Sequence, residues 1–218
     1  MTIDYSLARE NMVEQQVRPW DVLDLRVLDV LARLPREAFV PEAYRALAYT
    51  DLELPLGHGQ KMMKPVVEGR TLQALKVQAD EEVLEIGTGS GYLSACLGAL
   101  ARDVVSLEIE PALAAAARAR LDATNLGNNV RIETADALAW STDRRFDAIC
   151  VTGAVESIPS RFLQWLRPNG RLFVVRGQSP VMEAVLYQAD VNGGRVESLF
   201  ETDLAYLTGA APAPKFVF

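Results

Sequence analysis

An apolar run followed by three glycines constrains this chain more than any other feature of its 218 residues. Residues 83–86 read Val-Leu-Glu-Ile, which is typical of a buried parallel strand, and Gly87, Gly89 and Gly91 follow at every second position. Residues 92–100 then predict a helix. A strand, a glycine turn and a helix form the start of a nucleotide-binding βαβ unit, because glycines let a ligand approach the backbone and the helix N-terminus offers free N–H groups.

The spacing of the glycines distinguishes between two kinds of nucleotide. Dinucleotide-binding units carry G-x-G-x-x-G, whereas this chain has G-x-G-x-G with Glu85 two residues before the first glycine. This pattern resembles the S-adenosylmethionine-binding turn of Rossmann-like methyltransferases, and it disfavours a nicotinamide oxidoreductase. We expect Glu85 to order the turn or to contact the amino group of the cofactor. A tight turn without a ligand is the alternative, and the next two strands argue against it.

Two acidic residues follow at the ends of the next two predicted strands. Residues 104–108 end in Glu108, 21 residues after Gly87, close to the spacing of about 20 at which a carboxylate accepts from ribose hydroxyls. Asp136 follows the strand at 130–134, where it would accept from the adenine amine. Either acid alone could be a helix-start or loop residue, but together they favour a nucleoside ligand. The predicted cofactor-binding residues are Glu85, Gly87, Thr88, Gly89, Gly91, Glu108, Ile109, Asp136 and Ala137.

The composition argues against several other functions. The net charge of −7 at pH 7 disfavours a nucleic-acid partner, and no apolar run approaches the roughly 20 residues of a membrane span. The first five residues lack the basic and apolar regions of a signal peptide. With one histidine no metal site is expected, and Cys96 and Cys150 are expected to be small buried hydrophobic residues. We expect a cytoplasmic protein, with monomer and homodimer both open.

The order of the remaining elements predicts the fold class. Five alternating strand and helix units precede a hairpin, which predicts an α/β, Rossmann-like class I methyltransferase fold. Its seven-stranded sheet would be mostly parallel, with a last strand that runs against the others. Residues 1–64 are expected to form an N-terminal helical cap and substrate-covering loop, and residues 65–218 the core. The other predicted elements are helices at 7–17, 25–34, 65–77, 111–123 and 160–166, at most a short helix at 39–49, a loop or irregular strand at 51–60, and strands at 146–152, 171–175, 182–187 and 196–207.

Several longer segments resemble one protein family. They are residues 26–28, 35–41, 48–51, 54–60 and the glycine stretch 83–92, with looser matches at 146–149 and 168–170. On these segments the chain resembles protein-L-isoaspartate O-methyltransferases over most of its length. The Pro-Arg-Glu-x-Phe-Val-Pro and Gly-x-Gly-Gln segments are specific to that family, whereas the glycine turn is shared by most class I methyltransferases.

The resemblance implies a reaction, a cofactor and an acceptor. The reaction is methyl transfer by in-line displacement from S-adenosyl-L-methionine to a carboxylate of a damaged protein or peptide. A carboxylate has an ordinary pKa near ~4 and needs no general base at neutral pH. Gln60 and Met63 would lie at the transferred methyl group, with Glu68 on the same covering segment.

One segment departs from the family pattern. In the family, Gly-Gln is followed by Thr-Ile-Ser, where this chain has Lys61, Met62 and Met63, so Met63 takes the place of an active-site serine. The family's Pro-Val-Gly after the fifth strand is also altered, to Val175-Arg176-Gly177. Two alternatives therefore stand beside isoaspartyl methylation. One is a methyltransferase of the same fold for another acceptor, and the other is a cofactor-binding protein that has lost this activity.

Overall fold

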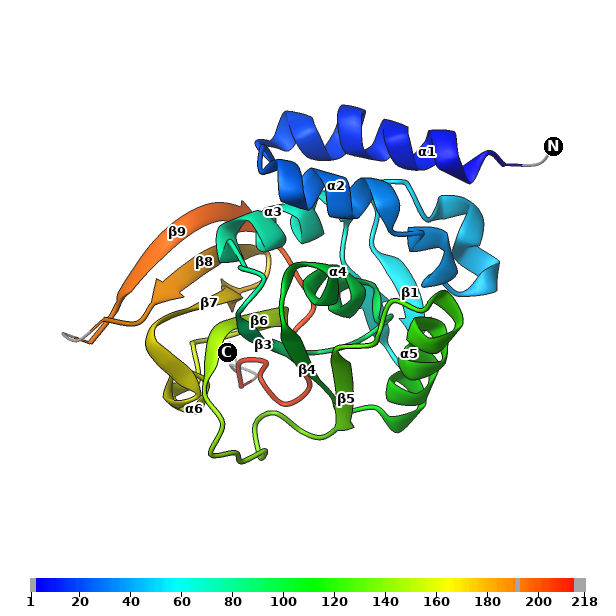
Figure 1. Ribbon diagram of the computed structural model, residues 1–218. Coiled ribbons are helices and arrows are strands. Elements are labelled where there is room, and N and C mark those ends of the chain that lie inside the picture. Colours follow the sequence, from blue (N-terminus) through cyan, green and yellow to red (C-terminus); the bar gives the residue numbers. More distant parts are fainter. Residues whose placement is uncertain (1–2, 191–192, 214–218) are drawn as a thin grey trace, which may run out of the picture.

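A single seven-stranded sheet lies at the centre of the computed structural model, which describes residues 3–190 and 193–213 (Figure 1). The strand order is β5-β4-β3-β6-β7-β8-β9, and the first five strands in this order are parallel. The predicted fold class is confirmed. The strands are β3 (Glu82–Ile86), β4 (Asp103–Glu108), β5 (Val130–Thr134), β6 (Phe146–Val155), β7 (Leu166–Gln178), β8 (Val181–Gln188) and β9 (Arg195–Thr202).

The direction of the last two strands refines the prediction. The last strand, β9, is antiparallel to its neighbour β8, and β8 is antiparallel to β7. Two reversals restore the original direction, so β8 runs against the central strands and β9 runs with them. The predicted strand at 196–207 was too long, because β9 ends at Thr202. Residues after Leu204 instead cross to β6, where Leu207 donates its N–H to the carbonyl of Ala154 at 2.9 Å.

The predicted helices are present, although most of them begin or end at other residues than predicted. The helix expected at 7–17 begins earlier, because the carboxylate of Asp4 accepts from the N–H groups of Ser6 and Leu7. Beyond Met12 it widens into a π-helical turn. The helices are α1 (Tyr5–Met12), the π turn (Val13–Val17), α2 (Leu25–Arg33), α3 (Pro65–Leu75), α4 (Tyr92–Leu100), α5 (Pro111–Thr124) and α6 (Ser160–Gln164), with 3₁₀ turns at Arg18–Trp20, Arg36–Ala38 and Glu42–Leu47.

The two faces of the sheet are covered unequally. On one face α3 and α4 pack against the strands, and α1 and α2 lie over them, as Figure 1 shows. The other face is covered by α6 and by loops, with Phe146, Phe162 and Trp165 in its core. The predicted alternation of strands and helices is wrong between β5 and β6. There the described residues 135–145 form turns and no helix. Trp140 from this connection packs edge-on against Trp165 instead.

A small hairpin stands apart from the main sheet. It consists of β1 (Leu54–Gly57) and β2 (Gln60–Met62), within and just beyond the segment expected to be a loop or irregular strand. His58 at its turn has a φ of 54° and is exposed, and its Nδ1 lies 3.4 Å from Glu110 Oε2. The chain then enters α3 through Lys64 and Pro65, so the hairpin is held against the carboxyl ends of the sheet strands.

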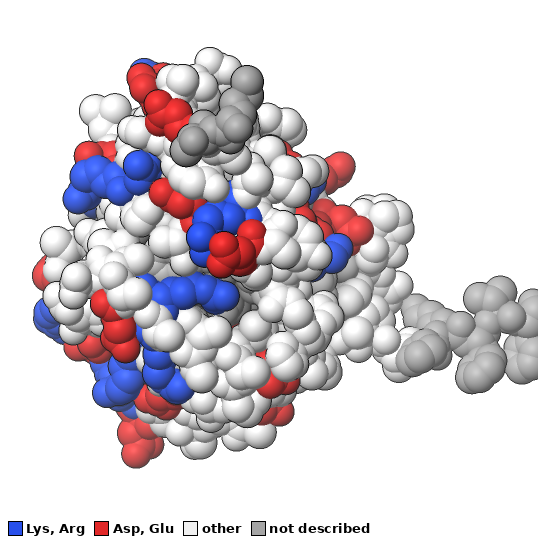
Figure 2. All heavy atoms as spheres, turned by 90° about the vertical axis from the view of Figure 1, so that its right-hand side faces the viewer, with Lys and Arg blue, Asp and Glu red and all other residues white. Residues whose placement is uncertain are grey.

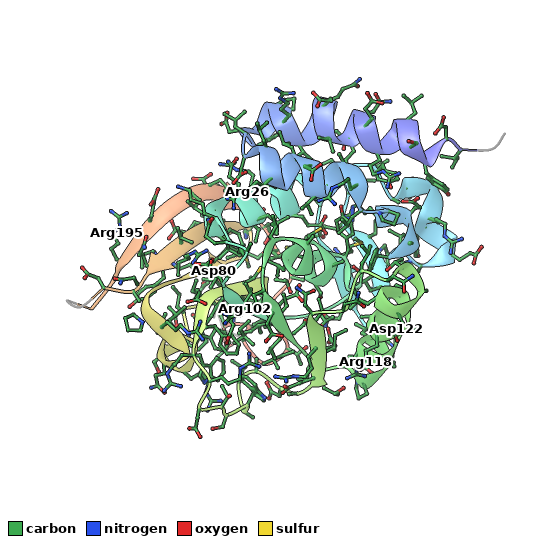
Figure 3. All side chains as sticks on the ribbon, in the orientation of Figure 1. Arg26, Asp80, Arg102, Arg118, Asp122 and Arg195 are labelled. Atoms are coloured by element: carbon green, nitrogen blue, oxygen red, sulfur yellow. The ribbon has the colours of Figure 1, made fainter. Side chains whose placement is uncertain are left out.

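Charged side chains are spread over the surface. In Figure 2 acidic and basic groups lie side by side, with neutral surface between them. Arg118 and Asp122 on α5 and Arg195 on β9 are all exposed (Figure 3). No helix in the described ranges is both long and apolar enough to cross a bilayer.

Candidate active site

One pocket brings together most of the residues predicted for the site. It lies at the carboxyl ends of β3, β4 and β6, beneath the hairpin, and its volume is about 950 Å³ when counted out to open solvent. This is the edge of a parallel sheet at which doubly wound folds bind ligands. Of the predicted residues, the pocket is lined by Gln60, Met63, Gly87, Thr88, Gly89, Glu108, Ile109, Asp136 and Ala137. Glu85 and Gly91 do not line it.

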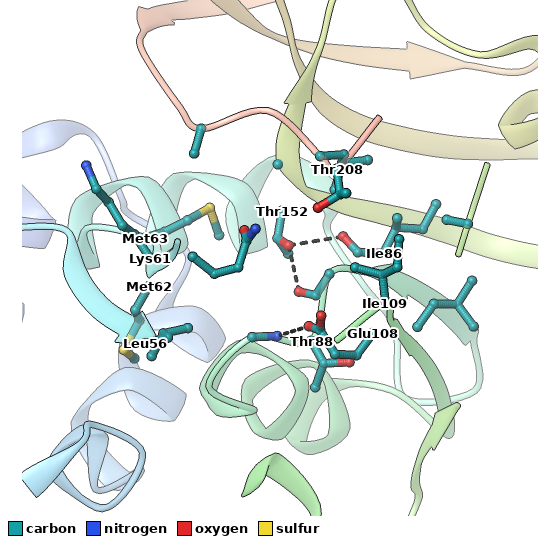
Figure 4. A pocket seen from close by; sticks show the side chains of 18 of the residues that line it. Leu56, Lys61, Met62, Met63, Ile86, Thr88, Glu108, Ile109, Thr152 and Thr208 are labelled. Carbon is teal, nitrogen blue, oxygen red and sulfur yellow. Dashed lines mark hydrogen bonds between the residues drawn. The ribbon is translucent and has the colours of Figure 1, made fainter. Parts of the chain in front are cut away.

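The glycine turn lies against Thr152 at the pocket wall. The hydroxyl of Thr152 donates to the carbonyl oxygens of Ile86 and Gly87, at 3.0 and 2.6 Å (Figure 4). Gly87 has a φ of 97°, and a Cβ at this position would lie 2.3 Å from the Thr152 hydroxyl. A side chain here would therefore clash with Thr152 and strain the backbone, which explains the glycine.

Glu108 ends β4 with its carboxylate at the glycine turn. It is buried, and its two oxygens accept from the N–H groups of Gly89 at 2.8 Å and Glu110 at 3.0 Å. The bond to Gly89 is drawn in Figure 4. These donors fix the carboxylate where it faces the pocket, and each carboxylate oxygen can accept a further hydrogen bond. The structure thus places Glu108 in the pocket, and its contact with a ribose stays a prediction.

Glu85 and Gly91 lie behind the pocket wall. Along β3 the side chains alternate, so Glu85 points to the α4 face, where its carboxylate accepts from the hydroxyls of Ser94 and Ser106. Burial raises the pKa of Glu85 to about 7, against hydrogen bonds that lower it. Ser106 also bonds the hydroxyl of Thr88, so Glu85 acts on the turn through this network. Gly91 begins α4, and a Cβ there would lie 3.1 Å from that of Ala117 on α5.

Asp136 lies beside Glu108 at the same edge of the sheet. One of its oxygens accepts from the N–H of Leu138 at 2.8 Å, which closes a turn. Ile109, which follows Glu108 in the chain, lines the same pocket although it is 40% exposed. An exposed apolar side chain in a pocket with two carboxylate acceptors suits a flat apolar ring with polar edges, such as a purine.

The hairpin forms the opposite wall. Figure 4 shows Leu56, Lys61, Met62 and Met63 on that side, and the Lys61 side chain extends away from the strand ends. Lys61 Nζ lies 3.0 Å from Glu53 Oε2, so its charge is balanced within the wall. Met62 and Met63 are both buried, and both line the pocket.

A buried arginine supports this wall from below. Arg36, from the Pro-Arg-Glu segment, is fully buried and donates to the carbonyl of Met63 at 2.6 Å and to the sulfur of Met62 at 3.2 Å. Its Nη2 lies 3.4 Å from Oε2 of Glu68, and its guanidinium lies 5.2 Å from the ring of Tyr92. In the sequence Arg36 is noticeable only as part of a family segment, because its neighbours Pro35 and Glu37 give no sign that it is buried.

The third wall was missed by the sequence analysis. Residues 204–208 line the pocket after β9, and Thr208 is visible there in Figure 4. They are held by backbone bonds between Ala154 and both Ala205 and Leu207, at 2.8 and 2.9 Å. Ser90 and Thr152 were also missed, although a threonine at the end of a buried central strand could have indicated Thr152. Among the residues that the structure describes, no group of three His, Cys, Asp or Glu side chains could hold a metal ion.

Comparison with known proteins identifies the family. The model of protein-L-isoaspartate(D-aspartate) O-methyltransferase (PCMT) matches residues 8–209. The chain belongs to this family. The resemblance seen in the sequence is thus confirmed.

Individual relatives agree with this assignment. The chain is 37% identical over 205 residues to protein-L-isoaspartate O-methyltransferase 2 of Marinobacter nauticus, covering 94% of this chain and 93% of the relative. It is 40% identical over 192 residues to the Myxococcus xanthus protein-L-isoaspartate O-methyltransferase, covering 86% and 91%.

Solved structures share the fold at lower identity. A Plasmodium falciparum chain assigned to the same family, crystallised with S-adenosyl-L-homocysteine, superposes with a TM-score of 0.79 at 19% identity, over 94% of this chain and 99% of that one. A second protein-L-isoaspartate O-methyltransferase gives a TM-score of 0.80 at 21% identity, over 93% and 66%. At such identities the superpositions show a common fold.

Proposed function

We propose that this chain methylates the carboxylate of isoaspartyl residues in damaged proteins and peptides. The cofactor is S-adenosyl-L-methionine. The observation that carries the proposal is the pocket itself, which joins the glycine turn and two acids at the strand ends to a wall that contains Gln60 of the family-specific segment 57–60. Membership of the family supports the same reaction.

The residues at the strand ends fit this cofactor. Glu108 is buried with its oxygens fixed by two N–H groups, so it would hold the ribose hydroxyls without reorganising. Asp136 would accept from the adenine amine, and Ile109 and Ala137 would pack against the ring. The bare backbone from Gly87 to Gly89 leaves room for the amino-acid part.

The chemistry requires placement more than acid–base catalysis. The cofactor supplies a methyl group bound to a positively charged sulfur. A carboxylate acceptor is already ionised at neutral pH, so the protein needs to align it, exclude water and provide a pocket of low polarity in which opposite charges are neutralised. Alignment alone can contribute roughly 7–11 kcal/mol. Gln60 and Met63 would lie at the transferred methyl group, on the wall opposite Glu108.

The direct test uses an isoaspartyl peptide and methyl-labelled cofactor. We expect a base-labile methyl ester on this peptide and none on the matched peptide with a normal aspartyl residue. A peptide that acquires no ester above background would contradict the proposal.

A second candidate is methylation of a different acceptor, and Met63 is the observation that favours it. Its thioether offers no hydroxyl at the place of the family serine. Loss of catalysis with retained cofactor binding is the related alternative. Labelling of lysate proteins and small molecules separates the three outcomes. If Met63→Ser alone gives isoaspartyl activity, the missing hydroxyl is the cause.

We also propose a cytoplasmic location and no nucleic-acid partner. Cys96 and Cys150 are both free and buried, which agrees with a reducing compartment, and the net charge of −7 disfavours nucleic acid. Monomer and homodimer remain open. Residues 1–64 are proposed as the acceptor-side cap and residues 65–218 as the cofactor-binding core.

A further inference from the structure

One acidic side chain lies on the acceptor side of the pocket with an oxygen that accepts no hydrogen bond from the described residues. Glu68, near the start of α3, lines the pocket and is 2% exposed. Within the described residues its Oε2 has no hydrogen bond, and Arg36 Nη2 lies 3.4 Å away. A buried carboxyl oxygen without a hydrogen bond is costly. Such a group at a pocket wall indicates that a ligand completes its contacts.

Met63 shares this wall with Glu68 and cannot supply a hydrogen bond to a ligand through its side chain. Its carbonyl oxygen is already used by Arg36, and its thioether is only a weak acceptor. A carboxylate acceptor needs a donor here, and an ionised Glu68 would repel it. A protonated Glu68 would provide an O–H donor.

We infer that Glu68, in its protonated form, donates a hydrogen bond to the acceptor carboxylate and so supplies the hydroxyl that Met63 lacks. This rests on the proposed isoaspartyl activity. The acceptor carboxylate brings the negative charge that balances Arg36, and the two carboxyl groups share one proton. In the reaction, the acceptor oxygen forms a bond to the methyl carbon while the carbon–sulfur bond breaks and leaves its electron pair on sulfur. The proton stays on Glu68, so none is consumed.

The surroundings of Glu68 support the neutral form. Burial raises the pKa of Glu68 to about 8, Arg36 opposes this rise, and the carboxylates of Asp51 and Glu85 add to it. Tyr92 and Cys96 on α4 are buried, and burial raises their pKa values well above the ordinary range, so both stay neutral. At pH 7 the acid is therefore mostly protonated. It loses its proton, and begins to repel the acceptor, as the pH rises through about 8.

The pH dependence of the reaction tests this role. We would measure release of S-adenosyl-L-homocysteine with an isoaspartyl peptide from about pH 6 to about pH 9.5, taking kcat/KM because it reports groups of the free enzyme. Wild type should decline above about pH 8, approaching tenfold per pH unit. Glu68→Gln keeps a donor in its amide, so it should retain most activity at pH 7 and lose the alkaline decline.

Two further variants and a control sharpen the test. Glu68→Leu should lower kcat/KM at pH 7 by about 10- to 100-fold, the range for one hydrogen bond to a charged group. Adding Met63→Ser to Glu68→Leu should recover most of this loss. Glu37→Gln, the same change in a half-buried residue outside the pocket lining, should keep the wild-type pH profile. Melting temperature and cofactor affinity check folding, and if Glu68→Leu does not fold, the Glu68→Gln profile decides.

The contrary outcomes are distinct. An active wild type whose Glu68→Leu variant has unchanged kcat/KM overturns the inference alone, as does an alkaline decline that persists in Glu68→Gln. Activity that rises with pH and is abolished by Glu68→Gln would assign a general base instead. A wild type that transfers no methyl group to the peptide at any pH overturns the proposed function, and this inference with it.

Discussion

The strand-end wall and the hairpin wall of the pocket are built on different principles. The strand-end wall uses adjacent parallel strands, so Gly87, Glu108 and Asp136 meet because β3, β4 and β5 end at one edge. The hairpin wall is assembled from β1, β2 and the first turn of α3, over a buried pair of Arg36 and Glu68. Regular geometry fixes the strand-end wall, whereas a single polar cluster supports the hairpin wall.

This difference implies separable effects of substitution. Changes on the strand-end wall should alter the affinity for cofactor, and changes beneath the hairpin should alter stability and turnover of the acceptor. A variant that changed both together would show that the two walls are mechanically coupled.

Arg36→Ala should have the largest effect on stability. It removes the donor to the Met63 carbonyl and leaves a cavity beside Glu68 and Tyr92, so the free energy of unfolding should fall by about 3–5 kcal/mol. Urea unfolding measures this. Arg33→Ala is the control, because the exposed pair of Arg33 with Asp29 should contribute about 0–1 kcal/mol. Equal losses in the two variants would contradict a special role for the buried pair.

Glu85→Gln should remove the part of the pH dependence of folding stability that comes from Glu85, behind the strand-end wall. The folded-state pKa of about 7 lies above the ordinary value of 4.5, so the folded state holds the proton more tightly than the unfolded chain. This contribution is fully present below about pH 4.5 and is lost as the pH rises through 7, on the order of 3 kcal/mol in all. Urea unfolding at several pH values should show that the free energy of unfolding falls less with rising pH in the variant than in wild type. Parallel curves for the two proteins would exclude this account.

Glu108→Ala should weaken cofactor binding by about 1–3 kcal/mol, because the ribose hydroxyls would lose their acceptor. Titration calorimetry with S-adenosyl-L-homocysteine measures the affinity. Glu110→Ala is the matched control: Glu110 caps α5 by accepting from the N–H of Ala112, so it should reduce stability and leave affinity unchanged. Unchanged affinity in Glu108→Ala would mean that the ribose lies elsewhere.

Gly87→Ala should show the effect of the close contact with Thr152. Gly59 has a positive φ too, but a Cβ there would meet nothing within 4 Å, so Gly59→Ala isolates the backbone strain. Gly87→Ala should destabilise the fold by about 1–3 kcal/mol more than Gly59→Ala, the usual cost of overpacking. Cofactor affinity should fall only in the Gly87 variant. Thermal melting of both variants would reveal whether the contact matters.

The sequence predicts the strand-end wall well, because its signals are local. Each signal can be recognised within a few residues: alternation within a strand, the spacing of glycines, or an acid after a strand. These signals indicated Gly87, Glu108 and Asp136, and all three residues line the pocket. Glu85 was placed less well. The two-residue period of a strand sends it to the α4 face, opposite Leu84 and Ile86, and the partners Ser94 and Ser106 give no separate signal.

The remaining walls depend on contacts between distant residues. Arg36 and Glu68 lie on separate elements, the 3₁₀ turn Arg36–Ala38 and α3, and they meet only in the folded structure. No local pattern around either residue predicts this pair. Likewise, residues 203–207 continue an apolar and polar pattern that favours a strand, but β9 ends at Thr202 and Tyr206 pairs with Ala154. Tertiary pairing overrode the local preference there.

The wall formed by residues 204–208 has a consequence for biosynthesis. Every other part of the pocket precedes these residues along the chain. While a ribosome is still making the protein, the glycine turn and both acids can already be in place with one side of the ligand cavity missing. A complete ligand cavity should therefore form only after residues 204–208 have been synthesised.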